Sequence, residues 1–407
     1  MLRPIFAAAV RRGASSSTAF PERTALTQQL WAARAEAKGS LPPFLVEKRP
    51  ADSLVSVPLP VASDAALRQH YEGFDGELRF GKVLEDLDAV AASIAHRHAD
   101  DNNPETRPLT IVTAAVDAID VVPGQLNLSH DYVYSGNVTY VGRSSLETTV
   151  AMRDAATNEA FLEAKFVMVA KDDSTGKPTP INQLLIETDA DREDFVRGEE
   201  AMAARKAASK AAKAAREAKD ACGAASGVHA QFAAYRQSDA YAAATMTMGV
   251  IGQTRMQSVA LCQPQQKNTR NKIFGGYLME RAFELALALC HLAPAPFTRC
   301  SLSAVDEISF HQPVAIGDIL TFDADIVHAD GNGFEVDVVA RKQCSSTGER
   351  STTNSFAFTF AADGLDAATS LRAPDEGAFE RMLAARKRYA HWTPASAAAI
   401  EAAAWHK

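Results

Sequence analysis

Two halves of the chain carry the same sequence landmarks in the same order, and this internal repeat limits the possible folds more than any other feature. Each landmark in the first half recurs in the second at a nearly constant separation. The matching pairs are Gly81 and Gly275, Ala115–Ile119 and Ala304–Ile308, Gly142 and Gly331, and Phe166–Ala170 and Phe358–Ala362. Such self-similarity indicates a duplicated structural unit. Two copies are too few for a solenoid, so we expect two similar domains.

Each repeat is predicted to contain a loop, one long helix and then about four strands. The helices are predicted at Val83–His98 and Tyr277–His291, where apolar residues recur every three or four positions. The strands alternate apolar and polar residues, which is typical of an antiparallel sheet with one buried face. They are predicted at Thr110–Val116, Asp131–Tyr140, Leu146–Met152, Phe161–Ala170, Cys300–Phe310, Ile319–His328, Phe334–Arg341 and Ser351–Ala362. A curled antiparallel sheet around a central helix is a hotdog, so we predict an α+β fold, a tandem double hotdog.

Composition marks further segments outside the repeats. The start of the chain is rich in Arg and Ser and has no acidic residue before Glu22, which is typical of an organelle transit peptide. Residues 192–221 are rich in Ala, Lys, Glu and Arg, which favours an exposed helix. The predicted segments are a mitochondrial transit peptide or disordered tail at 1–25, hotdog domain 1 at 60–190, a helical linker at 191–230, hotdog domain 2 at 245–365 and a helical C-terminal tail at 366–407.

Charge and cysteine content exclude several classes of partner. The 407 residues carry a formal net charge of −8, which argues against nucleic acid or an anionic membrane. No apolar run approaches the roughly 20 residues that span a bilayer. The Cys residues are odd in number, and no two have the spacing of a zinc or redox pair. We therefore expect no metal site, no membrane span and a compartment that keeps thiols reduced.

The segment Asn268–Met279 leads from a polar loop through two glycines into the second long helix. Gly275 and Gly276 let another group approach the backbone closely at the start of that helix. The free backbone N–H groups there favour an anion or a developing oxyanion. The pair is therefore a candidate substrate-binding element.

Several motifs together resemble the mitochondrial acyl-coenzyme A thioesterases 9 and 10, over roughly residues 60–365. They are Arg79–Asp88, Tyr140–Ser145, Phe166–Ala170, Asn271–Met279 and Ala304–Ile308. The resemblance implies a matrix enzyme that hydrolyses acyl-CoA thioesters to free fatty acid and coenzyme A. It also implies an oligomer of double hotdogs and an active site at the junction of the two hotdog domains. No cofactor is expected, because coenzyme A belongs to the substrate and the product.

The resemblance also implies catalytic residues. Asn268 precedes Gly275 by seven residues, where related two-domain thioesterases carry a catalytic Asn. The alternative role for a loop Asn is to cap a turn. Repeat 1 has Phe74 at the corresponding position, which offers no polar group. The two junctions should therefore be unequal, with one productive site.

The carboxylate that completes the site is left open among three candidates. Asp88 is preferred, because it borders the apolar stripe of the first long helix, where burial would favour a general base. Glu72 lies nine residues before Gly81, the spacing at which two-domain relatives place a catalytic Asp. Glu284 lies inside the most apolar helix, one turn after Arg281.

A basic, hydroxyl-rich turn in repeat 1 is a candidate for binding a phosphate of coenzyme A. It consists of Gly142, Arg143 and Ser144, followed by Ser145. Repeat 2 has the acidic segment Asp330–Gly333 in its place. The sequence also leaves open a non-catalytic acyl-CoA sensor on the same fold, because fold does not fix function.

Overall fold

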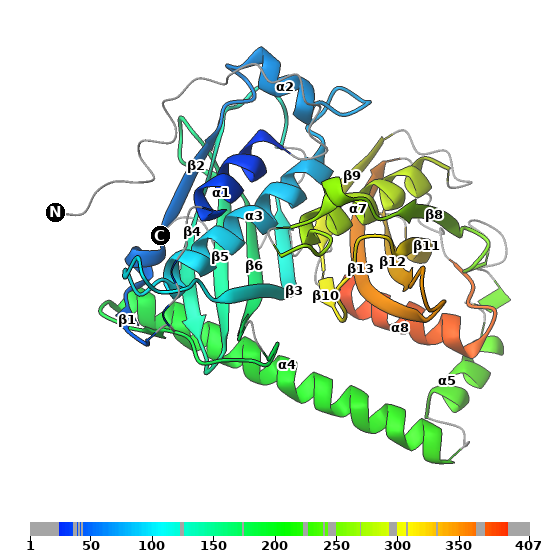
Figure 1. Cartoon of the computed structure of the whole chain (residues 1–407). Coiled ribbons are helices and arrows are strands. Elements are labelled where there is room, and N and C mark those ends of the chain that lie inside the picture. The colour runs from blue at the N-terminus through cyan, green and yellow to red at the C-terminus, as the bar shows by residue number, and fades with distance from the viewer. Residues whose placement is uncertain are drawn as a thin grey trace.

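Figure 1 shows the computed structural model, in which the central helices α3 (Phe80–Ala99) and α7 (Gly275–Leu292) lie side by side against a large sheet. The structure describes residues 24–35, 39, 41, 44–122, 126–172, 175–222, 227–238, 241–242, 250–268, 270–292, 299–306, 308–330, 333–363 and 371–389. The predicted leader up to residue 23, the landmark Gly331 and the tail from residue 390 lie outside these ranges.

Each repeat supplies one long helix and a set of antiparallel strands. Repeat 1 contributes α3 (Phe80–Ala99) and the strands β2 (Val55–Leu59), β3 (Thr110–Val121), β4 (Tyr132–Val141), β5 (Ser145–Asp154) and β6 (Ala160–Lys171). Repeat 2 contributes α7 (Gly275–Leu292) and the strands β8 (Met256–Leu261), β9 (Arg299–Val305), β10 (Ile308–Phe310), β11 (Ile319–Asp330), β12 (Gly333–Gln343) and β13 (Arg350–Asp363). The strand β2 precedes the predicted start of hotdog domain 1 at residue 60.

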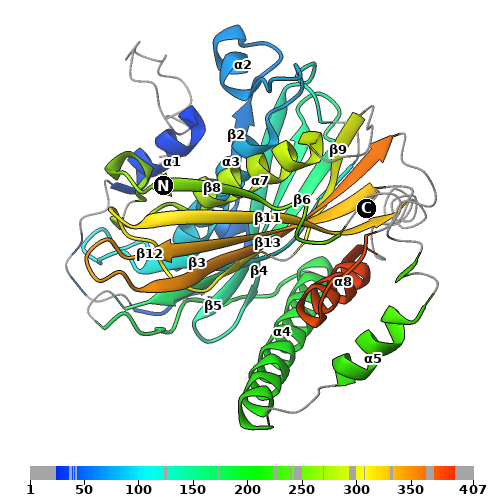
Figure 2. The same ribbon diagram turned by 90° about the vertical axis from the view of Figure 1, so that its right-hand side faces the viewer.

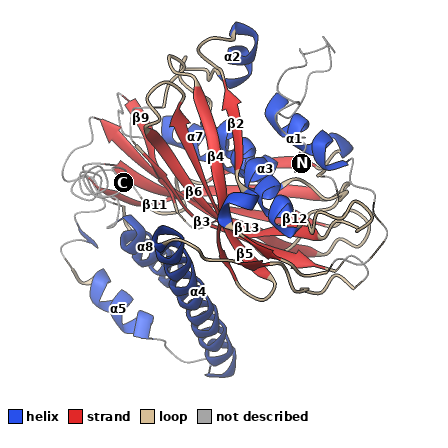
Figure 3. Cartoon of the chain, turned by 90° about the vertical axis from the view of Figure 1, so that its left-hand side faces the viewer, coloured by secondary structure: helices blue, strands red, loops and turns tan. Residues whose placement is uncertain are grey.

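The two repeats form one continuous sheet (Figure 3). In the described residues its order is β2-β4-β5-β6-β3-β10-β13-β12-β11-β8, with β9 pairing with both β13 and β3. The strands β3 and β10 join the repeats antiparallel, with Ile308 opposite Val116 and Ser309 opposite Ala115. From the outer edges inward, β2-β4-β5-β6-β3 of repeat 1 corresponds to β8-β11-β12-β13-β10 of repeat 2. This confirms the predicted tandem double hotdog.

The helices α3 and α7 pack against the sheet, each on the strands of its own repeat. The apolar residues of α3, such as Val83, Leu87 and Ile94, are fully buried. In α7, Phe283 packs against Phe358 and Phe360 of β13, with ring centroids 5.7 and 6.1 Å apart. Because both helices are buried, their polar residues must find partners inside the protein. Those partners define the sites described below.

Further helices cover the opposite side of the sheet (Figure 2). The helix α4 (Asp189–Cys222) packs closely on β4, because a Cβ on Gly198 would lie 2.4 Å from Cβ of Tyr140. The predicted linker helix is therefore docked at its first turns, although Figure 1 shows its later turns leaving the body. It leads to α5 (Gly227–Arg236), which packs against α8 (Glu376–Tyr389) through Phe232 and Phe379. Arg388 of α8 forms an ion pair with the buried Glu335 of β12.

Two short helices of repeat 1 were not predicted. The helix α1 (Ala25–Ala35) lies along α3 (Figure 1), and α2 (Ala65–Tyr71) precedes the loop to α3. Two short strands, β1 (Glu47–Lys48) and β7 (Gln183–Leu184), pair in parallel. Thr24 and Ala25, at the end of the predicted leader, belong to this folded part. In the part of the chain that the structure describes, no helix is long and apolar enough to cross a membrane.

Candidate active site

The first turn of α7 meets the middle of α3 at the carboxylate of Asp88. The backbone N–H of Gly276 donates to Oδ2 of Asp88 at 2.9 Å. The hydroxyl of Thr113, on β3, donates to Oδ1 at 2.8 Å. Asp88 is only 3% exposed, so both oxygens are held in one orientation. Asp88, Thr113 and Gly276 therefore bring together three elements from both repeats.

The glycine pair is what allows this close approach of the two helices. A Cβ atom on Gly276 would lie 2.9 Å from the backbone Cα of Glu85 in α3. A Cβ atom on Gly275 would lie 2.9 Å from Oδ2 of Asp88. Any other residue would push α7 away from α3 or from the carboxylate. The structure thus brings Asp88, the preferred of the three carboxylate candidates, into contact with the Gly275-Gly276 helix start.

A backbone donor and an aromatic ring complete the immediate surroundings. Gly275 is partly exposed, and among the hydrogen bonds between described residues none uses its N–H group. The ring of Phe310 would lie 3.1 Å from a Cβ on Gly275. The pairing of β10 with β3 places Phe310 beside the strand that carries Thr113. The helix dipole and a free N–H at this position favour a negatively charged oxygen.

Asn268 lies in the loop before α7 and caps a turn. Its Oδ1 accepts hydrogen bonds from the backbone N–H groups of Arg270 (2.8 Å) and Lys272 (3.2 Å). Its own N–H donates to the carbonyl of Lys272, three residues before Gly275. No hydrogen bond between described residues joins Asn268 to Asp88 or to the glycine pair. Since its oxygen is engaged, only the amide NH₂ group is left to act on a substrate.

The pseudo-equivalent junction, at the start of α3, has different chemistry. Arg79 forms ion pairs with Glu280 (3.1 Å) and Glu284, and Lys82 forms ion pairs with Glu280 (2.8 Å) and Glu85 (3.0 Å). Burial raises the pKa of Glu85 to about 7, although Lys82 opposes the shift. Charged side chains thus fill the space beside Gly81.

The remaining carboxylate candidates lie away from Asp88. Glu284 belongs to this second junction, where Arg79 and Arg281 are its partners. Glu72 is exposed and ends α2. Phe74, the counterpart of Asn268, is 77% exposed and contacts the ring of His291. The two junctions are therefore unequal in structure, as the sequence predicts.

The Gly142-Arg143-Ser144 turn lies near the C-terminal end of α3, whereas Gly81 lies at the N-terminal end of that helix. The carbonyl of Arg143 accepts from the N–H of Ile181, and the neighbouring Asn182 donates to the carbonyl of His98 in the last turn of α3. His98 follows Asp88 by ten residues, or about 15 Å along a helix. Arg143 is exposed, and no ion pair with a described residue involves its guanidinium. The turn is thus separate from the Asp88 contact.

Thr113 and Phe310 are site residues that the sequence reasoning missed. Thr113 lies within a predicted strand, and only the fold shows that its side chain points toward Asp88. Phe310 ends a predicted strand, and its place depends on the pairing between the two repeats. Among the described residues, no group of three His, Cys, Asp or Glu side chains is placed to hold a metal ion.

Several known proteins are similar to this chain over most of its length. A family model for the thioesterase superfamily matches residues 272–347, which include the glycine pair. The mitochondrial acyl-coenzyme A thioesterase 9 of Bos taurus is 32% identical over 334 residues, covering 80% of this chain and 74% of the relative.

Two other relatives have similar coverage. The mitochondrial acyl-coenzyme A thioesterase 10 of Mus musculus is 30% identical, covering 76% of this chain and 71% of the relative. The chloroplastic acyl-coenzyme A thioesterase 2 of Humulus lupulus is 32% identical, covering 82% of this chain and 80% of the relative. With this identity along both repeats of a double hotdog, the chain belongs to the acyl-coenzyme A thioesterase 9/10 family.

Proposed function

We propose that this acyl-CoA thioesterase hydrolyses its substrate at the junction where Asp88 meets the start of α7. The observation that carries the proposal is the hydrogen bond from Gly276 N–H to the Asp88 carboxylate, which joins the two repeats. A buried carboxylate beside a helix N-terminus combines a proton acceptor with donors for an oxyanion. The second junction holds ion pairs in place of this arrangement.

The reaction divides between a base and an oxyanion site. Asp88 accepts a proton from a water molecule while the water oxygen attacks the thioester carbonyl carbon. The carbonyl oxygen gains negative charge, which the N–H of Gly275 and the dipole of α7 stabilise. Collapse of the tetrahedral intermediate breaks the carbon–sulfur bond, and the coenzyme A sulfur takes the proton from Asp88. The products are free fatty acid and coenzyme A, and the reaction uses no cofactor.

Three neighbours assist these steps. Thr113 holds the carboxylate of Asp88 in one orientation by its hydrogen bond, and this fixes the base relative to the attacking water. The ring of Phe310 offers an apolar wall for the acyl group beside Gly275. Asn268 supplies its amide NH₂ group to the water or to the carbonyl oxygen when substrate is bound, since its oxygen remains in the turn.

Two substitutions distinguish a catalytic role of Asn268 from its role as a turn cap. Asn268→Asp keeps an oxygen for the turn but removes the NH₂ donor, and Asn268→Ala removes both. We expect both variants to lose about 10²–10³-fold in kcat, the usual loss for one donor to a developing oxyanion. The measurement is thiol release at saturating acyl-CoA. An Asn268→Asp enzyme with the wild-type kcat would limit Asn268 to the turn.

Arg143 and its turn are proposed to bind a phosphate of coenzyme A. The separation from Asp88 along α3 agrees with a ligand whose long pantetheine arm joins phosphates to the thioester. The exposed guanidinium and the hydroxyl of Ser144 suit a phosphate group. Arg143→Ala should therefore raise KM and leave kcat unchanged, because a phosphate contact holds substrate and transition state equally.

Thiol-release assays across a series of acyl-CoA chain lengths test the function itself. Turnover that Asp88→Asn abolishes would support an enzyme, whereas tight acyl-CoA binding without turnover would support the sensor. The Arg-rich leader and the mitochondrial relatives support import into the mitochondrial matrix, although one relative is chloroplastic. We also propose a homo-oligomer of double hotdogs, which sedimentation of the purified protein would measure.

A further inference from the structure

A fully buried carboxylate on α3 anchors the N-terminal helix. Asp86 accepts hydrogen bonds from the hydroxyls of Thr24, Thr27 (3.4 Å), Tyr71 (2.5 Å) and Tyr134 (3.4 Å). Burial raises the pKa of Asp86 to about 7, and the hydroxyls of Thr24 and Tyr71 oppose that shift. A buried carboxyl group without hydrogen-bond donors would lower the stability of the protein, so the folded state strongly favours keeping these hydroxyls at Asp86.

The first turn of α1 is therefore fixed to the same helix that carries Asp88. Thr24 and Thr27 supply two of the hydroxyls, and the backbone N–H of Thr24 also donates to Glu85 at 3.1 Å. Leu26 and Leu30 are each 5% exposed and join the main core. Both Asp86 and Glu85 lie within one turn of Asp88. The docking of α1 and the catalytic carboxylate thus share one short segment of α3.

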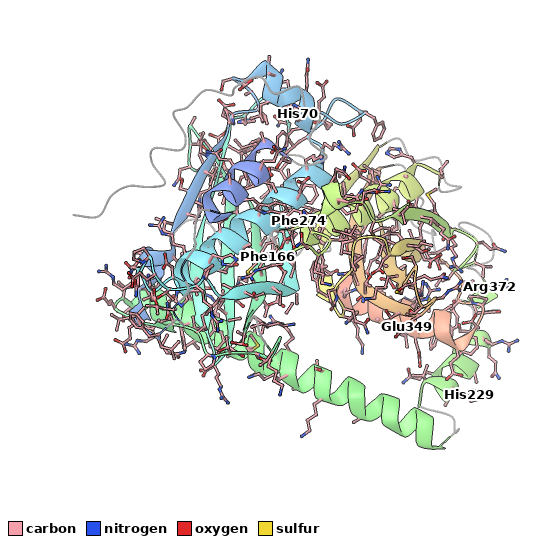
Figure 4. All side chains as sticks on the ribbon, viewed as in Figure 1. His70, Phe166, His229, Phe274, Glu349 and Arg372 are labelled. Atoms are coloured by element: carbon pink, nitrogen blue, oxygen red, sulfur yellow. The ribbon has the colours of Figure 1, made fainter. Side chains whose placement is uncertain are left out.

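The far end of α1 reaches the start of α7. The ring of Trp31 meets the ring of Phe274 edge to face, with centroids 4.8 Å apart. Phe274 immediately precedes the glycine pair and lies at the junction of the repeats (Figure 4). Its Cε1 would lie 2.7 Å from a Cβ on Gly276, so the ring packs directly against that glycine. The ring of Phe274 is thereby held between Trp31 and the backbone that binds Asp88.

We propose that α1 is a positioning element of the active site and that Trp31 is its positioning residue. The inference rests on the site proposed above. Trp31 fixes the ring of Phe274, and Phe274 fixes the turn that aims the N–H groups of Gly275 and Gly276. The hydroxyls on Asp86 hold α1 in place for this task. A displacement of only about 1 Å in such donors can cost a hundredfold in rate.

Kinetics of Trp31 variants in the full chain test this. We expect Trp31→Ala to lower kcat at least tenfold, which corresponds to about 1.4 kcal/mol of barrier, with KM within about twofold. Trp31→Phe keeps an aromatic edge and should restore most of kcat. Ala25→Gln, on the exposed side of α1, is the matched control and should match the wild type. A Trp31→Ala enzyme with lowered thermal stability but wild-type kcat would overturn the proposal.

A second variant keeps the test decisive if Trp31→Ala does not fold. Thr24→Val with Thr27→Val removes two donors to Asp86 without touching Trp31 or the glycine pair. We expect the same loss of kcat, and wild-type kcat in this double variant would contradict a role for α1. The outcome of Asp88→Asn separates this inference from the site. Loss of activity in Asp88→Asn with full activity in both α1 variants would refute only the positioning role.

Discussion

Replacing Asp88 by Asn is expected to lower kcat by about 10²–10⁴-fold, the contribution of a general base, with little change in stability. Asn has the same shape, and its oxygen can still accept from Gly276 or Thr113. It cannot accept a proton from water. The measurement is thiol release at saturating acyl-CoA, with the melting temperature of both proteins as the check on folding.

The matched control is Glu280→Gln at the second junction. Glu280 is also a buried carboxylate beside a helix start, and its partners are Lys82 and Arg79. Removing its charge should cost stability, because the buried Lys82 then loses its ion pair with Glu280. We expect kcat within about threefold of the wild type, under 1 kcal/mol of barrier. An active Asp88→Asn enzyme would assign the base elsewhere, and an inactive Glu280→Gln enzyme would assign chemistry to the second junction.

The second large effect is expected at Gly276. A Cβ there would meet the backbone of Glu85, which cannot move unless α3 shifts as a whole. Gly276→Ala should therefore destabilise the protein by about 1–3 kcal/mol, the usual cost of overpacking. It should also lower kcat by a hundredfold or more, because the donor moves away from Asp88. Urea unfolding and steady-state kinetics measure the two effects.

Gly81→Ala provides the comparison at the pseudo-equivalent position. Its Cβ would lie 3.1 Å from Cγ of Glu280, a side-chain atom that can rotate away. Ala also favours a helix over Gly by about 0.5–1 kcal/mol, so we expect stability and kcat near the wild-type values. Equal losses in Gly81→Ala and Gly276→Ala would mean that the two junctions contribute alike to catalysis.

The double hotdog was predictable because its pattern is local and duplicated. Strand alternation such as that of Ile319–His328 depends only on neighbouring residues, and β11 begins at the predicted residue. The edge strand β2 was missed because Val55–Leu59 is short and contains Pro58. The helix α1 was missed because the Arg-rich segment before it indicated a leader, whereas its docking depends on Asp86, about sixty residues away.

The sequence favours a contact between Asp88 and the start of α7 because the two repeats differ at their loops and helices. Only repeat 2 has an Asn in its loop, and Asp88 borders the buried stripe of the other helix. The places of Thr113 and Phe310 at the site could not be predicted, because they depend on how β3 and β10 pair across the repeats. The ion pairs of Arg79 were missed for the same reason. A single sequence shows which residues a helix buries but not which residues of the other repeat they face.

The central claim is that one productive site combines Asp88 of repeat 1 with the loop and helix start of repeat 2. A double-mutant cycle tests it most directly, with kcat measured for the wild type, Asp88→Asn, Asn268→Asp and the double variant. Residues that act as one unit are not additive, so the double variant should lose little more than the worse single variant. Losses that multiply would place the two residues in independent roles and contradict a shared site.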